Sequence, residues 1–389
     1  MSFNPADFAA KAMREVPASA VRKLFDIAST LNDPVSLGIG EPDFSTPMHI
    51  CEAAWESLKQ GKTGYSPNAG IMPLREAIAS YLEKFDLHYD PSCEIMACCG
   101  ANQGLDLVFR TVLEPGDEVI LPEPAFLCYR PMIALCGAKV VSVTTTLEEG
   151  FKVDPKKIEA AITPKTKALM LNFPSNPTGV VLKKEDLEEL AKICVKHNLL
   201  VISDEIYAEL TYGGTHFSIA SLPGMKERTV LVSGASKAFA MTGWRLGCLC
   251  APKELMALFT KAQMYSAVCA STPSQWAGIE AFTNGQADAD EMVAAYDARR
   301  QYMVKAFRDL GLDLCEPLGA FYLFPSIQKT GLTSEEFSEK VLEQQEVIVV
   351  PGNAFGPAGE GFIRCSYATS MTDLERAVER LDKFLQQYR

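Results

Sequence analysis

Seven short apolar runs recur between residues 94 and 252 of this 389-residue chain, and helical patterns separate them. The runs are EIMACC (94–99), DEVILP (117–122), KVVSVT (139–144), KALMLNF (167–173), LLVIS (199–203), TVLVS (229–233) and LGCLCA (246–251). Runs of this length, rich in Val, Ile and Leu, are typical of strands buried on both faces of a sheet that helices cover. The pattern therefore predicts an α/β fold with a three-layer α/β/α large domain around a mostly parallel seven-stranded sheet.

The last hundred residues show a different pattern, which predicts a smaller α+β domain over 286–389. Short strand-like pieces precede a helical stretch at 372–388, which we expect to begin with a capping box of Thr372 and Glu375. The segment 1–45 lacks a complete strand–helix unit, and we expect it to pack with this smaller domain. Residues 46–285 then form the large domain.

Composition excludes several classes of protein. A net charge of −12 argues against nucleic acid and anionic membranes as main partners. No run approaches the ~20 apolar residues of a membrane span, and the first residues lack the apolar core of a secretory signal. Twelve cysteines without regular spacing indicate reduced thiols and a cytoplasmic protein. Four scattered histidines predict no metal site.

Polar residues follow several of these runs, at the edge where ligands bind in α/β sheets. Lys237 follows TVLVS among small residues, and Arg245 stands eight residues further on. Desolvation and a nearby positive charge would lower the pKa of the Lys237 amine and make it a nucleophile, while a guanidinium can clamp a phosphate. The pair suggests a Schiff base with a phosphorylated aldehyde cofactor, against the simpler alternative of a surface lysine.

Other strand ends fit pyridoxal chemistry. Asp204 could keep a pyridine nitrogen protonated, and Asn176 and Tyr207 could bind the ring's phenolic oxygen. The backbone N–H groups of Ala101 and Asn102, in GANQG, could form an anion site at a helix N-terminus. Each residue also has a purely structural alternative, as a helix cap, a turn residue or a strand-to-helix junction.

Several longer segments resemble the class I aminotransferases of the fold-type-I pyridoxal-phosphate enzymes, over nearly the whole chain. The segments are SLGIGEPDFSTP (36–47), GYSPNAGIMPLREAIA (64–79), NFPSNPTG (172–179), SDEIYAEL (203–210), SKAFAMTGWRLG (236–247), GAFYLFP (319–325) and FIRCSYATS (362–370). The chain is most similar to the aspartate, aromatic and N-acetyl-diaminopimelate aminotransferase branch.

The resemblance implies the chemistry of the site. Lys237 is expected to bind the aldehyde of pyridoxal 5'-phosphate and to act as general acid and base, with Asp204 and Tyr207 as the other catalytic residues. Arg364, Gly40 and Asn176 are expected to bind the substrate, Arg364 through its α-carboxylate.

The resemblance also implies further cofactor contacts and an assembly. Phe126 is expected to stack on the cofactor ring, in a place where many relatives carry tryptophan or tyrosine. Many relatives have a serine where Gly234 stands, so Ser236 is the predicted hydroxyl contact to the phosphate, with Ser233 as the alternative. Tyr65 matches a tyrosine that reaches the phosphate of the neighbouring subunit, which predicts a homodimer with shared active sites.

The implied reaction is a two-stage ping-pong transfer from an L-amino acid to a 2-oxo acid, with 2-oxoglutarate the expected acceptor. The donor is expected to be of aspartate, aromatic or diaminopimelate type. Residues 17–25 are expected to line the entrance, where Arg22 or Lys23 could meet an acidic side chain. The alternatives are a pyridoxal-phosphate-dependent carbon–sulfur β-lyase and a binding protein that keeps the fold without turnover.

Overall fold

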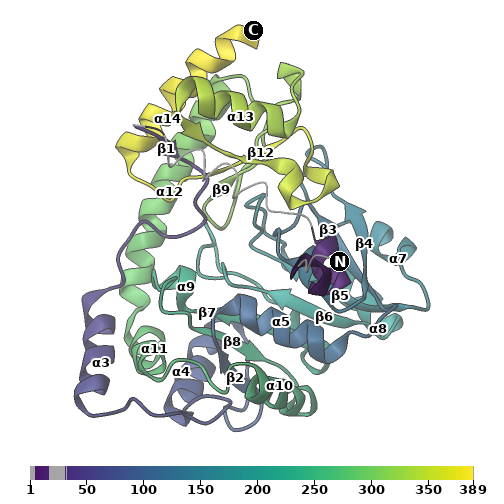
Figure 1. Ribbon diagram of the computed structural model, residues 1–389, viewed down its shortest axis with the longest axis vertical. Helices are drawn as coiled ribbons and strands as arrows, with labels where there is room; N and C mark the ends of the chain where they lie inside the picture. The colour runs from purple at the N-terminus through teal and green to yellow at the C-terminus, as the bar shows by residue number, and fades with distance from the viewer. Residues whose placement is uncertain (1–4, 17–30, 32, 389) are drawn as a thin grey trace.

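A seven-stranded sheet forms the centre of the computed structural model, which describes residues 5–16, 31 and 33–388 (Figure 1). Its strands are β2 (Ile95–Cys98), β3 (Glu118–Glu123), β4 (Lys139–Thr144), β5 (Thr166–Asn172), β6 (Leu200–Asp204), β7 (Thr229–Gly234) and β8 (Gly247–Cys250). The order is β2-β8-β7-β6-β5-β3-β4, and only β8 runs antiparallel to its neighbours. Each predicted run forms one strand, so the predicted mostly parallel seven-stranded sheet is confirmed.

Helices cover both faces of this sheet. Side chains of alternate residues leave a strand on opposite sides, so the apolar residues of each strand need cover on both faces. In β2, Met96 and Cys98 pack in one apolar cluster with α5, α6 and α10, whereas Ile95 and Ala97 pack in another with α4 and α11. The helix α8 covers the second face further along, over β5 and β6. The helices of this part of the chain are α3 (Met48–Lys59), α4 (Met72–Leu82), α5 (Ala101–Val112), α6 (Tyr129–Leu135), α7 (Pro155–Ala160), α8 (Lys184–Lys196), α9 (Ala235–Ala238), α10 (Lys253–Ser266) and α11 (Thr272–Asn284).

The edge strand β4 departs from the prediction that every strand is buried on both faces. Only Val143 of its six residues is buried, while Lys139, Ser142 and Thr144 are exposed. β4 is an edge strand that pairs with β3 alone, and α6 packs against it, whereas α4, α5 and α10 all pack on the other edge strand, β2, whose four residues are buried. The prediction of two-sided burial is therefore wrong for this run.

The C-terminal part combines short strands with three helices. A three-stranded sheet has the order β11 (Val350–Pro351), β12 (Ile363–Ser366) and β9 (Tyr322–Leu323). The helices are α12 (Gln286–Asp309), α13 (Ser334–Gln345) and α14 (Met371–Leu385). The early strand β1 (Val35–Ser36) pairs in parallel with β10 (Val347–Ile348), so residues distant in sequence lie side by side here.

The helix α14 begins two residues earlier than the sequence pattern predicts. Ser370 is the N-cap: its hydroxyl accepts a hydrogen bond from the N–H of Asp373 at 3.1 Å and donates one to that side chain at 2.9 Å. The predicted capping box of Thr372 and Glu375 is therefore wrong, because Thr372 lies inside the first turn. One face of α14 is apolar and buried, with Leu374, Ala377, Leu381 and Leu385 in the core and Val378 packed against it.

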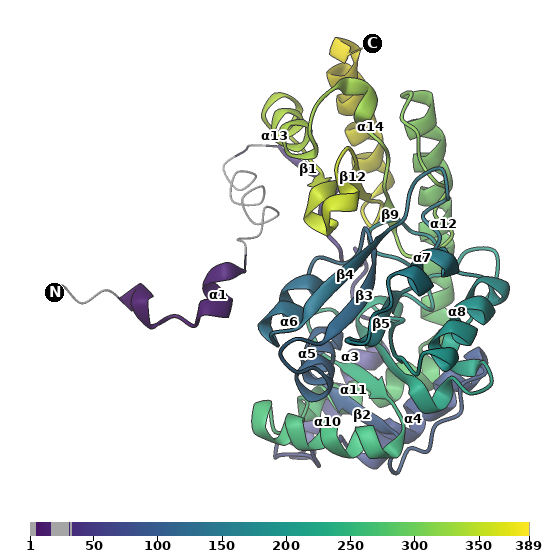
Figure 2. The same ribbon diagram turned by 90° about the vertical axis from the view of Figure 1, so that its right-hand side faces the viewer.

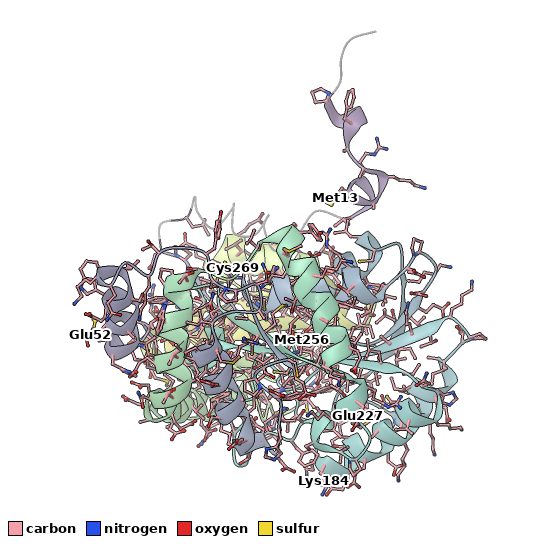
Figure 3. The ribbon with its side chains drawn as sticks, turned by 90° about the horizontal axis from the view of Figure 1, so that it is seen from below. Met13, Glu52, Lys184, Glu227, Met256 and Cys269 are labelled. Atoms are coloured by element: carbon pink, nitrogen blue, oxygen red, sulfur yellow. The ribbon has the colours of Figure 1, made fainter. Side chains whose placement is uncertain are left out.

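The short helix α1 (Lys11–Glu15) lies beside α6 at the edge of the molecule, as the side view shows (Figure 2). The side chain of Met13 on this helix is 56% exposed (Figure 3). Among the described residues, no helix is both long enough and apolar enough to cross a bilayer.

Candidate active site

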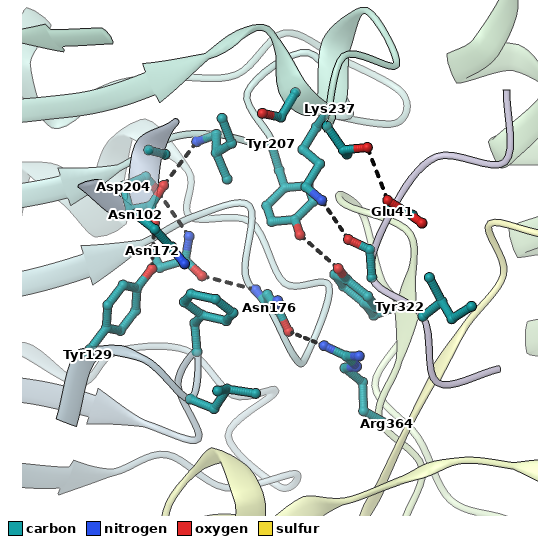
Figure 4. Close-up of a pocket in the computed structure, with 18 of the residues that line it drawn as sticks. Glu41, Asn102, Tyr129, Asn172, Asn176, Asp204, Tyr207, Lys237, Tyr322 and Arg364 are labelled. Atoms are coloured by element: carbon teal, nitrogen blue, oxygen red, sulfur yellow. Dashed lines mark hydrogen bonds between the residues drawn. The ribbon is translucent and has the colours of Figure 1, made fainter. Parts of the chain in front are cut away.

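A cavity of about 440 Å³ opens where β5, β6 and β7 end (Figure 4). The predicted site residues that line it are Gly40, Ala101, Asn102, Phe126, Asn176, Asp204, Tyr207, Ser236, Lys237, Arg245 and Arg364. Tyr65 and Ser233 are not in its lining, and the Tyr65 side chain is 88% exposed. The segment 17–25, with Arg22 and Lys23, lies outside the described residues.

The amine of Lys237 faces the cavity from α9, one short turn after β7 ends. Its Nζ donates a hydrogen bond of 2.5 Å to the carbonyl oxygen of Gly40. The pKa of this amine is lowered to about 8, mainly by burial and in part by the charges of Arg364 and Arg245, while Glu41 and Asp204 act in the opposite direction. A far larger fraction of the amine than for an ordinary lysine is therefore uncharged near neutral pH, and the uncharged amine is the form that acts as a nucleophile or general base.

Asp204 ends β6 and is fully enclosed. Its Oδ2 accepts a hydrogen bond of 2.7 Å from the hydroxyl of Tyr129, and its Oδ1 accepts one from the N–H of Ile206 at 3.2 Å. Burial raises the pKa of the Asp204 carboxyl to about 6, although the bond from Tyr129 opposes this rise. A buried carboxylate of this kind is stabilised by a cation placed against it.

Two asparagines hold the turn after β5. Asn172 donates from Nδ2 to the carbonyl oxygen of Asp204 at 3.0 Å, and its Oδ1 accepts from the N–H of Asn176 at 3.1 Å. The Oδ1 of Asn176 in turn accepts from Nη1 of Arg364 at 3.1 Å. Asn176 is thereby fixed between the sheet and the C-terminal part of the chain.

Arg364 reaches the cavity from β12 and is 5% exposed. Its Nη2 donates to the carbonyl oxygen of Gly38 at 2.7 Å. Within the described part of the chain, its buried Nε makes no hydrogen bond. A buried guanidinium with an unmet donor, and with Nη1 and Nη2 bound only to neutral oxygens, fits an anionic ligand such as a carboxylate.

The N-terminus of α5 and Arg245 form a positively polarised corner. Gly100 caps the helix at φ +79°, and a Cβ on it would lie 2.5 Å from Nη2 of Arg245. Likewise, a Cβ on Gly247 would lie 2.5 Å from the backbone nitrogen of Ala101. The two glycines let the guanidinium and the first N–H groups of α5 share one corner, which suits a phosphate.

Sequence reasoning missed three residues of this site, namely Tyr129, Asn172 and Tyr322. All three lie in segments in which neighbouring residues were predicted to belong to the site. Their own hydrogen-bond partners, however, are distant in the sequence. Tyr129 contacts Asp204 across 75 positions, and Tyr322 places its hydroxyl 2.7 Å from that of Tyr207. A buried tyrosine in an apolar run gives no sequence signal that separates it from a core residue.

Among the described residues, no three His, Cys, Asp or Glu side chains lie together in a way that could hold a metal ion. The cations that line the cavity there are Lys237, Arg245 and Arg364. The arrangement can therefore hold a phosphate at one end and a carboxylate at the other, with an amine and a buried carboxyl between them.

Comparison with known proteins identifies the family. The model of the aminotransferases of class I and II matches residues 32–381. An aspartate aminotransferase of Pyrococcus abyssi is 49% identical over 376 residues, 96% of this chain and 97% of that one. An aromatic-amino-acid aminotransferase of Thermococcus litoralis is 46% identical over 376 residues, which cover 96% of this chain and 97% of that one. The crystal structure of an aromatic aminotransferase from Pyrococcus horikoshii is 48% identical and superposes with a TM-score of 0.89, over 94% of this chain and 99% of that one.

These relatives are described as aminotransferases, so the comparisons favour transamination over the β-lyase alternative and over a protein without turnover. The predicted resemblance is confirmed, and the fold of the solved relatives agrees with the sheet described above. The chain belongs to the class I and II aminotransferases, and the protein is an aminotransferase.

Proposed function

We propose that the protein is a pyridoxal 5'-phosphate-dependent aminotransferase that works by a two-stage ping-pong mechanism. The donor is an L-amino acid of aspartate, aromatic or diaminopimelate type, and the acceptor is a 2-oxo acid, 2-oxoglutarate in the first instance. The observation that carries the proposal is the buried amine of Lys237, with its pKa of about 8, in one cavity with Asp204 and Arg364.

The residues present fit the cofactor at each of its functional groups. The N–H groups of Ala101 and Asn102 with Arg245 suit the phosphate, and the Lys237 amine suits the aldehyde. Asp204 suits the pyridine nitrogen. When bound, pyridoxal phosphate supplies an electron-withdrawing ring that makes the substrate's Cα–H acidic.

The remaining cofactor contacts in the proposal concern the ring face, the ring oxygen and the phosphate. Phe126 would stack on the ring of the bound cofactor, where it lacks the polar atom that a tyrosine or tryptophan would add. Asn176 and Tyr207, both of which are buried, would bind the ring oxygen. Ser236 is favoured over Ser233 as the hydroxyl at the phosphate, because Ser236 lines the cavity.

Asp204 has an electrostatic role in this scheme. Its carboxyl is protonated more readily than usual because burial raises its pKa to about 6. Asp204 would hold the ring nitrogen of the bound cofactor in its protonated form, and that positive charge would in turn stabilise the buried carboxylate. Tyr129 and the Ile206 N–H keep the carboxylate oriented toward that partner.

Lys237 moves the proton. At a pKa of about 8, about a quarter of the amine is uncharged at pH 7.5, against about 0.1% for a lysine with a pKa of 10.5. Its Nζ would take the proton from the substrate's Cα and pass it to the carbon of the cofactor's aldehyde group, and it would move a proton in the opposite direction in the second half-reaction. The Gly40 carbonyl oxygen and the rings of Tyr207 and Phe321, 5.8 and 5.7 Å from Nζ, confine the amine beside the cavity.

Arg364 holds the α-carboxylate of the substrate, which orients Cα toward Lys237. Gly40 lies next to it: a Cβ there would be 3.7 Å from Nη2 of Arg364 and 2.8 Å from the Tyr322 hydroxyl. The absence of a side chain at Gly40 therefore leaves room for the carboxylate.

The proposed assembly is a homodimer in which Tyr65 completes the partner's site. Tyr65 projects into solvent from a loop that the rest of the chain holds firmly. Thr272 donates to the carbonyl oxygen of Gly64 at 2.8 Å, and Asn68 donates to that of Val268 at 2.7 Å. An exposed tyrosine on a fixed loop is well suited to reach a phosphate in a second subunit.

The proposed location is the cytoplasm. All twelve cysteines are free thiols. Free thiols in this number favour a reducing compartment.

A donor panel tests the proposal. The purified protein, loaded with pyridoxal phosphate, is incubated with 2-oxoglutarate and aspartate, phenylalanine, tyrosine or diaminopimelate derivatives in turn, and glutamate formation is measured. Lys237→Ala should lose the activity. The matched control is Lys84→Ala, since Lys84 is also partly buried; it should keep the activity because Lys84 pairs with Glu209 away from the cavity. Turnover by the Lys237→Ala protein at the wild-type rate would refute the proposal, and pyruvate release from cystathionine without transamination would favour the lyase.

A further inference from the structure

Tyr322 is a buried tyrosine that contacts several groups of the proposed site, and its register on the sheet explains how. It pairs with Ser366 across β9 and β12. Arg364 stands two residues before Ser366, so its side chain leaves the sheet on the same face as the tyrosine. The Arg364 guanidinium carbon accordingly lies 4.5 Å from the centre of the Tyr322 ring.

The hydroxyl of Tyr322 shares a hydrogen bond with that of Tyr207. The oxygens are 2.7 Å apart, and the two residues are 0% and 4% exposed. Burial raises the pKa of both phenols, so each oxygen carries a proton at neutral pH. Only one of the two protons can lie between the oxygens. When Tyr322 donates to Tyr207, the proton of Tyr207 remains available for a ligand.

The same hydroxyl lies next to the peptide that holds the lysine. A Cβ built on Gly40 would be 2.8 Å from the Tyr322 oxygen, and the Gly40 carbonyl oxygen accepts the bond from Lys237. Figure 4 shows Tyr322 between Tyr207, Lys237 and Arg364. One side chain from the C-terminal sheet therefore touches the carboxylate-binding arginine and the phenol beside the lysine.

We propose that Tyr322 is a positioning residue with two separable contacts, its ring orienting the Arg364 guanidinium and its hydroxyl donating to Tyr207 so that Tyr207 donates to the ligand. The inference rests on the proposed function. Because a hydroxyl that accepts a hydrogen bond becomes a better donor, Tyr322 strengthens the bond that Tyr207 makes in the cavity. The ring contact acts on substrate affinity, and the hydroxyl contact acts on the reaction step.

Removal of the hydroxyl alone tests this division. In Tyr322→Phe the ring stays over Arg364, so KM for the amino donor should change by less than about twofold, while kcat falls about three- to tenfold. The pH midpoint of the visible absorption change of the cofactor-loaded protein should move to higher pH, because Tyr207 donates more weakly. The control is Tyr367→Phe, which removes a hydroxyl from an equally buried tyrosine that pairs with Tyr212 at 3.5 Å outside the cavity lining.

A double-mutant cycle with Tyr207→Phe tests whether the hydroxyls act as a pair. If Tyr322 acts through Tyr207, Tyr322→Phe should lower kcat no further in the Tyr207→Phe background. Equal losses of kcat in both backgrounds would overturn the proposal. So would a Tyr322→Phe protein that matches Tyr367→Phe in kcat and absorption midpoint, or one in which only KM rises.

A second change covers the case in which Tyr322→Phe folds poorly. Site-specific 3-fluorotyrosine at position 322 keeps the ring and hydroxyl but makes the phenol a stronger donor, so the absorption midpoint should move to lower pH. An unchanged midpoint would overturn the proposal. Failure of the proposed function is separate, because wild-type protein would then lack both transamination and cofactor bound at Lys237.

Discussion

Replacement of Asp204 by asparagine should stabilise the cofactor-free protein while it abolishes activity. The Asp204 carboxyl has a pKa of about 6 in the folded chain and an ordinary value of 3.8. A carboxyl whose folded-state pKa is raised destabilises the fold above that pKa, and the cost disappears as the pH falls below the unfolded-state pKa. From these two values the cost is about 3 kcal/mol at pH 7.5 and about 1 kcal/mol at pH 4.5.

Urea unfolding of the cofactor-free proteins at matched concentration measures this difference. Asp204→Asn should unfold with a free energy higher than wild type by about 3 kcal/mol at pH 7.5, and the gain should shrink to about 1 kcal/mol at pH 4.5. The control Asp106→Asn removes a carboxylate from an exposed ion pair with Arg110 and should change little at either pH. A loss of stability in Asp204→Asn at pH 7.5, or a gain that does not vary with pH, would refute the reasoning.

Two further substitutions test the local geometry. Gly100→Ala should weaken pyridoxal-phosphate binding at least about tenfold in a fluorescence titration. The new Cβ would lie 2.5 Å from Nη2 of Arg245, and the backbone conformation of φ +79° and ψ 159° costs alanine about 1–3 kcal/mol. Gly116→Ala, at φ +97° with no atom within 4 Å, carries the backbone strain without the clash and should bind normally. Ser370→Ala should lower the free energy of unfolding by about 1 kcal/mol, and Thr372→Ala should lower it by less than half of that. A larger loss in Thr372→Ala than in Ser370→Ala would instead support an N-cap at Thr372.

The sheet could be predicted from the sequence because each strand carries its own signal. Runs such as KALMLNF and TVLVS are apolar, rich in strand-forming residues and bounded by turn residues, so each strand formed within a few residues of its run. The exposure of β4 could not be predicted, because it depends on the order of the strands and on which helices pack on the edge strand, and not on the residues of β4 itself. The N-cap of α14 was predicted at the wrong residue because the sequence offers two equivalent choices. Ser370 and Thr372 both stand three positions before an acidic residue that could complete the cap.

The candidate site was predictable where polar residues end strands. Asp204 directly follows an apolar run, and Asn176 and Lys237 follow theirs within four residues, which identified the edge of the sheet at which they meet. Tyr129 and Tyr322 could not be found in this way. Their hydroxyls matter because the fold brings them to Asp204 and Tyr207, and nothing local to either residue records that contact.

The central claim is that the Lys237 amine binds the cofactor's aldehyde, and reductive trapping tests it most directly. The protein is incubated with pyridoxal phosphate, reduced with borohydride, digested and analysed by mass spectrometry. The account predicts one peptide with the added mass of the reduced cofactor, and fragmentation that places this mass on Lys237. The cofactor trapped on another lysine, or bound without any trapped lysine, would contradict it.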